Sequence, residues 1–260
     1  MSIKFVHSIM LTSHRKQSIL ASLKRDGQVI AKSLSESFGV SEDTIRRDLR
    51  ELAAEGLLQR VHGGALPSSP AVADYGHRLQ ISTVAKSAIA RAAVGLISNG
   101  QVVILDGGTT SLELAKQLPS TLQATVVTHS PSIAVELVSH PGIEVVLIGG
   151  RLFKHSVVTV GAAAIEAMSH IRADIYFMGV TGVHPTAGLS TGDLEEAYIK
   201  QALAARAAEI VVLASTEKIN AASAYVIADA ATADTLVVDR ETPEALTAPL
   251  AALGITILRP

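Results

Sequence analysis

The sequence predicts an α/β protein, in which an N-terminal winged helix-turn-helix is followed by a mostly parallel, Rossmann-like α/β domain. Three observations predict this class. Short amphipathic helices and one hairpin fill the first 66 residues, a Pro- and Ser-rich stretch follows them, and apolar strands then alternate with helices to the C-terminus. We therefore divide the 260 residues into a head (1–66), a linker (67–82) and a body (83–260).

Composition excludes several classes of protein. The chain has no cysteine, which rules out a disulfide scaffold, thiolate zinc ligands and thiol catalysis, and we expect no metal site and no cofactor. Hydrophobic residues make up 48%, too many for a mainly disordered chain, and no apolar run approaches the roughly 18 residues of a membrane span. Lys4 and His7 interrupt the apolar N-terminus, and no cleavage site follows it. We expect a cytoplasmic protein that does not bind a membrane.

The charge is unevenly distributed along the chain. The formal net charge of the whole chain is −2, which by itself argues against a nucleic-acid partner. Residues 1–65 carry ten Lys/Arg and seven Asp/Glu, whereas residues 66–260 carry twelve and seventeen. A basic head on an acidic body is typical of an appended nucleic-acid-binding module, although a difference of this size can also arise by chance.

The head contains three predicted helices, at residues 14–25, at 31–38 and from 42 to Gly56, with Ser13 and Ser41 as caps of the first and third. A short turn with a glycine joins the second helix to the third, which is the arrangement of a helix-turn-helix. Alternating apolar and polar residues around a Gly-Gly pair then predict a small β-hairpin at 57–65, which would be a wing beside the helices.

The exposed side of the third helix is rich in arginine, which can donate two parallel hydrogen bonds to guanine or pair with phosphate. The alternative is the solvated face of an ordinary amphipathic helix, but the order helix, turn, helix, wing favours DNA. The head has only two aromatic residues, Phe5 and Phe38, so we expect duplex DNA rather than a single strand. The predicted DNA contacts are Ser41, Thr44, Arg46, Arg47, Arg50, Arg60 and His62.

The body alternates apolar strands with helices of 8–15 residues, which predicts a mostly parallel sheet covered on both faces. The predicted strands are at 101–105, 124–127, 144–148, 175–180, 209–214, 225–228, 235–238 and 255–258, and the helices at 84–97, 111–118, 132–139, 162–169 and 194–208. Ligands of such sheets bind beyond the carboxyl ends of the strands.

The first of these strands runs into a turn with two glycines and three hydroxyls, and then into a helix. Glycines let the backbone approach an anion, and the free N–H groups of a helix start can bind it, so the turn resembles a phosphate cradle in its chemistry. The alternative is a tight turn with Thr/Ser capping. The ends of the other strands carry further polar groups, and Lys200 lies four residues after Glu196, a spacing that usually gives a surface ion pair. The predicted effector-binding residues are Asp106, Gly107, Gly108, Thr109, Thr110, Ser111, Thr128, His129, Ser130, Gly149, Gly150, Arg151, Lys154, Glu196, Lys200 and Lys218.

The stretch from Val40 to Leu49, with Gly56 and the run from Arg60 to Ala65, resembles the DeoR-type bacterial repressors. The body continues the resemblance through Arg78, Lys86 and the residues around Lys218. The resemblance implies a winged helix-turn-helix and a body similar to ribose-5-phosphate isomerases that senses a phosphorylated sugar. It further implies that residues 107–111 hold the phosphate and that Glu196 and Lys218 face the sugar. The chain departs from the family pattern just before Lys218, where it reads Ala-Ser-Thr-Glu.

The resemblance implies a transcriptional repressor of carbohydrate-metabolism genes that a phosphorylated sugar releases from its operator. The isomerases carry a carboxylate-bearing motif after the fourth strand, whereas residues 179–184 here contain no carboxylate, so we expect binding without turnover. The alternatives are an isomerase-like enzyme with a DNA-binding head, and a scaffold that binds no ligand. Because operators are usually read by symmetric dimers, we expect a homodimer or homotetramer.

Overall fold

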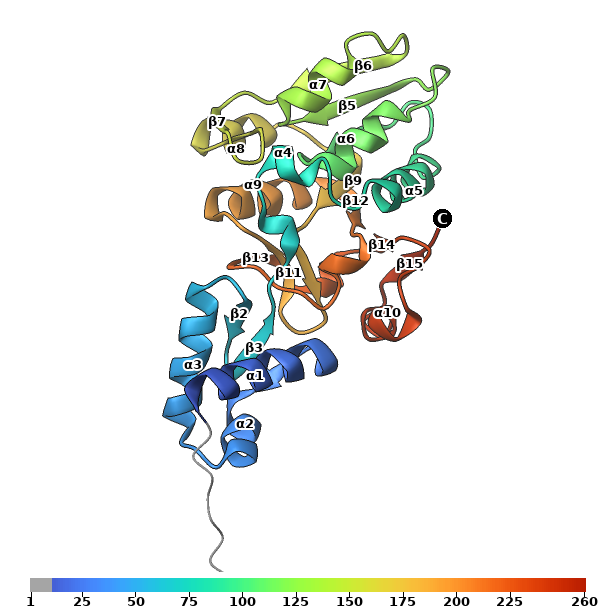
Figure 1. Ribbon diagram of the computed structural model, residues 1–260. Coiled ribbons are helices and arrows are strands. Elements are labelled where there is room, and N and C mark those ends of the chain that lie inside the picture. Colours follow the sequence, from blue (N-terminus) through green and yellow to red (C-terminus); the bar gives the residue numbers. More distant parts are fainter. Residues whose placement is uncertain (1–10) are drawn as a thin grey trace, which may run out of the picture.

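The protein is described by a computed structural model of residues 11–260 (Figure 1). The sequence prediction for the N-terminal apolar segment concerns residues 1–10, which lie outside the described part. The head and the body are separate units joined by the linker, and the α/β class is confirmed.

The head is a winged helix-turn-helix. Its elements are α1 (Thr12–Asp26), β1 (Val29–Ile30), α2 (Ala31–Phe38), α3 (Glu42–Ala54), β2 (Leu58–Val61) and β3 (Gly64–Pro67). The strands form a sheet in the order β1-β3-β2, so the wing is anchored by β1. Gly64 makes this pairing possible, because a Cβ there would lie 1.9 Å from the carbonyl oxygen of Val29.

The caps of the head are only partly as predicted. Ser41 caps α3 by accepting a hydrogen bond from the amide of Thr44 at 3.2 Å. The prediction that Ser13 caps α1 is wrong, because the helix begins two residues earlier than predicted and its N-cap is Leu11. The apolar positions Ile19, Ile45 and Leu49 are buried in the core of the head, as their spacing predicts.

The body is built on a seven-stranded parallel sheet. Its strands, in spatial order, are β15 (Thr256–Leu258), β14 (Thr235–Val237), β12 (Ala207–Leu213), β9 (Ala173–Gly179), β4 (Val102–Leu105), β5 (Ala124–Thr128) and β6 (Ile143–Leu147). Every neighbouring pair is parallel.

Helices cover both faces of this sheet, and alternate residues of each strand point into two separate cores. Val103 and Leu105 join the core under α5 (Thr83–Val94), α6 (Thr109–Lys116) and α7 (Pro131–Leu137). Ile104 joins the opposite core, under α8 (Ala162–Met168), α9 (Leu194–Ala204) and α10 (Glu244–Ala251). Within residues 11–260, no helix is long and apolar enough to cross a membrane.

Two antiparallel additions lie beside the sheet, and of their strands only the one at 225–228 was predicted. One is the hairpin of β7 (Arg151–Phe153) and β8 (Val158–Val160). The other is a small sheet of β10 (Gly182–His184), β11 (Gly188–Thr191) and β13 (Tyr225–Ala228). Short 3-10 helices complete the body, η2 (Thr216–Lys218) and η3 (Ala230–Thr232).

The linker is not a free tether. It forms η1 (Pro70–Val72) and α4 (Tyr75–Arg78), and η1 lies against η2 of the body. The amide of Tyr75 donates to the carbonyl of His155 at 2.8 Å, which ties the linker to the turn between β7 and β8. The linker therefore lies across the body at the carboxyl ends of the central strands (Figure 1).

Candidate functional sites

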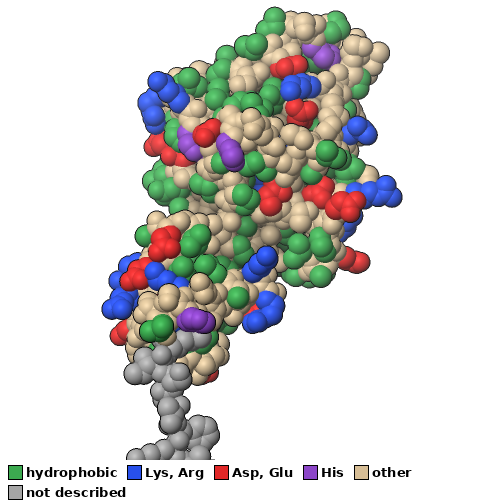
Figure 2. Space-filling model, viewed as in Figure 1, with side chains coloured by type: hydrophobic (Ala, Val, Ile, Leu, Met, Phe, Trp, Pro, Cys, Tyr) green, Lys and Arg blue, Asp and Glu red, His purple; other side chains and the backbone are tan. Residues whose placement is uncertain are grey.

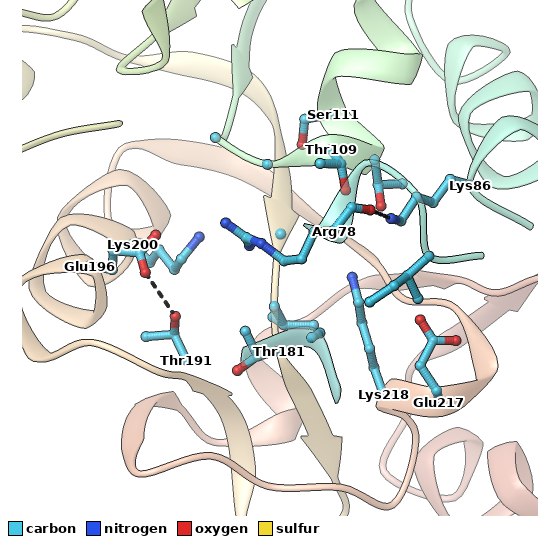
Figure 3. Close-up of a pocket in the computed structure, with 17 residues that line it drawn as sticks. Arg78, Lys86, Thr109, Ser111, Thr181, Thr191, Glu196, Lys200, Glu217 and Lys218 are labelled. Atoms are coloured by element: carbon cyan, nitrogen blue, oxygen red, sulfur yellow. Dashed lines mark hydrogen bonds between the residues drawn. The ribbon is translucent and has the colours of Figure 1, made fainter. Parts of the chain in front are cut away.

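A cavity opens at the carboxyl ends of β4 and β9, where the start of α6, the linker, α9 and η2 meet. Figure 3 shows Arg78 between Glu196 and Lys200 on one side and Lys86 and Lys218 on the other. The residues that line the cavity are Ala71, Arg78, Ile81, Lys86, Gly107, Gly108, Thr109, Thr110, Ser111, Gly179, Val180, Thr181, Thr191, Glu196, Lys200, Glu217 and Lys218.

The turn after β4 forms one wall of the cavity. Gly107 is required there because a Cβ would lie 2.0 Å from Cγ1 of Val158, and Gly108 has a φ of 124°. The helix α6 begins at Thr109, so its first backbone N–H groups are without helical partners. These groups and the adjacent hydroxyls can bind an anion at this wall.

Two buried polar atoms beside the cavity have no hydrogen-bond partner within residues 11–260. They are Oγ of Ser111 and Nε of Arg78, each of which can donate. A buried donor without a partner lowers the stability of the folded protein, because it has lost its hydrogen bonds to water. A ligand that accepts hydrogen bonds from both groups removes this cost and therefore binds more tightly. Anionic oxygens are suitable acceptors for both groups.

Asp106 does not line the cavity, but it bonds to three residues that do, Gly107, Gly179 and Lys200. Its fully buried carboxylate accepts hydrogen bonds at 2.8 Å from the amides of Gly107 and Gly179 and from Nε2 of His129, and it also pairs with Lys200. Although burial favours the neutral carboxyl, the charge of Lys200 and the bond from His129 hold the pKa of Asp106 well below its usual range. A charged Asp106 therefore fixes the cradle backbone and the position of Lys200.

The cavity concentrates positive charge. The ammonium group of Lys86 donates a hydrogen bond to the backbone carbonyl of Arg78, and Lys218 is buried nearby. Burial lowers the pKa of Lys218 to about 8, against the attraction of Glu217 and with further lowering by Lys86 and Arg78. Burial also lowers the pKa values of Lys86 and Arg78. A bound anion would relieve this crowding of cations.

The expected surface ion pair between Glu196 and Lys200 is not formed. Both side chains are buried, and Lys200 bonds to Asp106 while Glu196 accepts from Oγ1 of Thr191 at 3.5 Å. The helix spacing puts the two residues on one face of α9, and that face lies over the end of the sheet, where Asp106 is available. The tertiary environment thus decides the partners of both side chains.

The structure does not bring all predicted effector residues to the cavity. Thr128, His129 and Ser130 are buried behind it, and His129 is occupied by Asp106 and the carbonyl of Thr159. Arg151 and Lys154 are exposed on the hairpin that follows β6, and Gly149 and Gly150 also lie outside the cavity. Because β6 is the edge strand, its end lies two strands away from β4.

Several lining residues were absent from the predicted set. Arg78 and Lys86 appear in the sequence only as part of the family resemblance, and Thr181, Thr191 and Glu217 carry no motif that marks them. Arg78 comes from the linker, Lys86 from α5 and Glu217 from η2. Thr181 and Thr191 come from the segment after β9 and from β11.

The predicted DNA-binding residues lie on α3 and the wing. Arg46, Arg47 and Arg50 are exposed, and Arg46 shares a hollow with Arg60 and His62 between the helix and the wing. Figure 2 shows basic and acidic side chains interleaved along this edge of the head. Arg46 is held by Glu42 at 2.8 Å, and Arg47 lies 3.7 Å from Glu51. These exposed pairs are weak, so phosphate or a base can compete for both arginines.

A buried ion pair beneath this surface was not predicted. Nε of Arg15 donates to Asp48 at 2.5 Å and Nη2 donates at 3.0 Å, joining α1 to α3. The hydrogen bond to Asp48 raises the pKa of Arg15 despite burial. The sequence contains one signal for it, since Asp48 falls on the same helix face as the buried Ile45 and Leu52.

Comparison with known proteins agrees with both units. Residues 15–70 match the DeoR-like helix-turn-helix domain, and residues 81–240 match the DeoR C-terminal sensor domain. The chain is 33% identical to the HTH-type transcriptional regulator GlpR of Haloferax volcanii over 96% of this chain and 98% of that protein. It is 31% identical to the glycerol-3-phosphate regulon repressor of Escherichia coli, over 80% of this chain and 83% of that protein.

Among solved structures, ribose 5-phosphate isomerase A of Methanocaldococcus jannaschii aligns with a TM-score of 0.38 and 21% identity, covering 51% of this chain and 52% of that one. The two domain matches and the full-length relatives are what decide the classification. The chain belongs to the DeoR family of helix-turn-helix transcriptional regulators.

Proposed function

We propose that the protein is a repressor of carbohydrate-metabolism genes that binds duplex operator DNA through α3 and the wing, and that a phosphorylated sugar bound in the cavity releases it. The names of relatives support this proposal. One is the glycerol-3-phosphate regulon repressor, and the HTH-type transcriptional repressor GlcR of Bacillus subtilis is 32% identical over 96% of this chain.

The observation that carries the proposal is the pair of partnerless donors beside the cavity. Ser111 Oγ and Arg78 Nε lie next to a glycine turn and a helix start, with Lys86 and Lys218 around the same space. Phosphate combines negative charge with several acceptor oxygens, which is the chemistry that such a site satisfies.

The linker gives a route from the cavity to the head. Ala71, Arg78 and Ile81 belong to the linker and line the cavity, so a ligand contacts the segment that carries the head. On the other side of the cavity, Lys218 is followed by Ile219 and Asn220, which border a hollow against the end of α1. A ligand that shifts either segment changes the geometry of the head, with a coupling of typically about 1–3 kcal/mol.

We propose binding without turnover in this cavity. Isomerisation of a sugar phosphate needs a base at the carbon that loses its proton, and residues 179–184, where the isomerases carry a carboxylate motif, contain no carboxylate. The family resemblance implies that Glu196 faces the sugar. An enzyme with a DNA-binding head remains the alternative. Multiple turnover of a pentose or hexose phosphate that is lost in Glu196→Gln would support that alternative and contradict ours.

Operators read by proteins of this kind usually have two-fold symmetry, so we propose that the protein is a homodimer or homotetramer. We propose that it acts in the cytoplasm, where the DNA is.

The direct test of sensing starts from a DNA duplex that the wild-type protein selects from a random library. Phosphorylated sugars that raise the melting temperature should also change the affinity for this duplex, measured by fluorescence anisotropy. A panel that shifts neither quantity contradicts sensing of a phosphorylated sugar.

The DNA-binding residues are tested with the same duplex. Arg47→Ala should weaken binding by about 1–3 kcal/mol if the side chain contacts a base. Arg206→Ala, in the body, is the matched control because it removes the same charge far from α3. Unchanged binding by Arg47→Ala would remove this residue from the interface.

A further inference from the structure

A second chamber adjoins the cavity on the side away from Lys218. Its wall includes Phe153, His155 and Ser156 from the turn between β7 and β8, together with Asp193 at the start of α9. Arg78, Thr181 and Glu196 line both the cavity and this chamber. The two spaces are therefore neighbours that share these three side chains.

The turn between β7 and β8 is held in place against the linker. Nη2 of Arg78 donates to Oγ of Ser156 at 3.1 Å, and the carbonyl of His155 accepts from the amide of Tyr75. Val157, the next residue, has a φ of 54°, a conformation that a β-branched side chain rarely adopts. Backbone strain of this kind persists where the surroundings impose it, and it concentrates at ligand sites.

The chemistry of the chamber differs from that of the phosphate cradle. It is lined by two carboxylates, Asp193 and Glu196. Among its lining residues, Arg78 is the one Lys or Arg, and Arg78 also lines the cavity. The rings of Phe153 and His155 are stacked with centroids 5.7 Å apart. Carboxylates accept hydrogen bonds from hydroxyl groups, and ring faces pack against the C–H groups of a sugar. A second phosphate would instead be repelled by both carboxylates.

We propose that this chamber is the specificity subsite of the sensor: it binds the hydroxyl-bearing end of a hexose-sized monophosphate, with His155 and Asp193 as specificity-determining residues. This inference rests on the proposed function, since it requires the phosphate to occupy the cradle at residues 107–111. The turn between β7 and β8 then distinguishes one effector from another, while the cradle recognises the phosphate they share.

The test compares probes that share the phosphate and differ in the rest. Inorganic phosphate, glycerol 3-phosphate, the 6-phosphates of glucose, fructose and galactose, and fructose 1,6-bisphosphate are titrated into the full-length protein by calorimetry. We expect at least one hexose 6-phosphate to bind about tenfold or more tightly than inorganic phosphate, the equivalent of one good hydrogen bond to a charged group. The bisphosphate should bind more weakly than that hexose monophosphate.

Two variants separate the chamber from the cradle. His155 is exposed, so His155→Ala should fold, and Asp193→Asn keeps an N-cap for α9 because Asn caps helices as well as Asp does. Each should weaken the hexose 6-phosphate about fivefold to tenfold and inorganic phosphate less than twofold. Leu152→Ala is the control, because Leu152 lies on β7 just before the turn that carries His155, is exposed and does not line the chamber.

The outcomes distinguish the inference from the function on which it rests. If no probe binds, both are wrong. If inorganic phosphate and glycerol 3-phosphate bind as tightly as every hexose phosphate, or if the two variants weaken all probes equally or none, the cradle stands and the specificity subsite is wrong.

Discussion

The ammonium group of Lys218 is buried close to Lys86 and Arg78, and burial lowers its pKa to about 8. A phosphate dianion in the cavity favours the protonated form and raises that pKa, so binding takes up a proton above about pH 8. Affinity for inorganic phosphate should therefore hold from pH 7 to about pH 8 and fall between pH 8 and 10. Calorimetry in two buffers of different ionisation enthalpy measures the proton uptake, and an affinity independent of pH up to 9.5 would contradict this role.

The same residue predicts a conflict between stability and binding. The pKa of Lys218 is lower in the folded chain than in the unfolded one, so the unfolded state binds more protons between pH 8 and 10.5. Stability without ligand therefore rises over that interval, and the cost of burying the charge is fully present below pH 8. Lys218→Met should stabilise the free protein by about 2 kcal/mol at pH 7 while it weakens phosphate binding. Urea unfolding with and without phosphate checks both effects; a less stable Lys218→Met protein would contradict the first.

Asp48 joins α3 to α1 through its buried ion pair with Arg15. Removing one partner of a buried ion pair leaves a charge without compensation, so Asp48→Ala should destabilise the head by about 3–5 kcal/mol. Asp43→Ala is the control, because Asp43 is exposed on the same helix. Thermal unfolding measures the loss. If Asp48→Ala costs no more than Asp43→Ala, the pair with Arg15 does not hold α1 to α3.

At the scale of elements, the turn between β4 and α6 requires a glycine at its second residue, Gly107. In Gly107→Ala the new methyl group would meet Val158, which is β-branched and buried, so the turn or β8 must move. We expect inorganic phosphate to bind at least tenfold more weakly. Displaced backbone donors need to cost only about 1.4 kcal/mol of binding free energy to produce a tenfold loss. Gly95→Ala, at a helical φ of −65°, is the control. Wild-type affinity in Gly107→Ala would mean that the backbone of this turn does not contact phosphate.

The elements that the sequence predicted well are those whose pattern is local. The central strands β4, β5, β9 and β12 are mostly apolar segments between helices, and α3 begins at a serine cap and buries residues at helical spacing. The hairpins β7–β8 and β10–β11 were missed because their strands have three or four residues, too few for alternation to show. These two hairpins supply Thr191 to the cavity and Phe153, His155 and Ser156 to the second chamber.

At the scale of the whole molecule, one short segment of the body runs from the cavity to the head. Lys218 lines the cavity, and Asn220, two residues later, has a φ of 56° and borders the hollow against α1. The amide of Ala222 then donates to the carbonyl of Pro67 at the end of the wing, at 3.4 Å. A ligand that moves Lys218 thereby reaches the head through four residues of chain.

Asn220 therefore provides a test of coupling. Glycine adopts a positive φ without strain and valine does not, so Asn220→Gly should keep the segment in place and Asn220→Val should displace it. The ratio of operator affinities with and without a bound sugar phosphate should stay near wild type in Asn220→Gly and fall toward one in Asn220→Val. Ligand affinity measured in the absence of DNA should change little in Asn220→Gly. A wild-type ratio in Asn220→Val would exclude this segment as the route.

The sequence alone determined the order of the elements, the winged helix-turn-helix, the parallel sheet and the glycine turn after β4, because each depends on neighbours within one or two turns of the chain. Tertiary structure decided which polar groups meet. Asp106 and Lys200 are 94 residues apart, Arg15 and Asp48 are 33 apart, and Arg78 reaches the cavity from the linker. No local pattern encodes these pairings, because a buried charge takes whichever partner the packed strands and helices bring within reach.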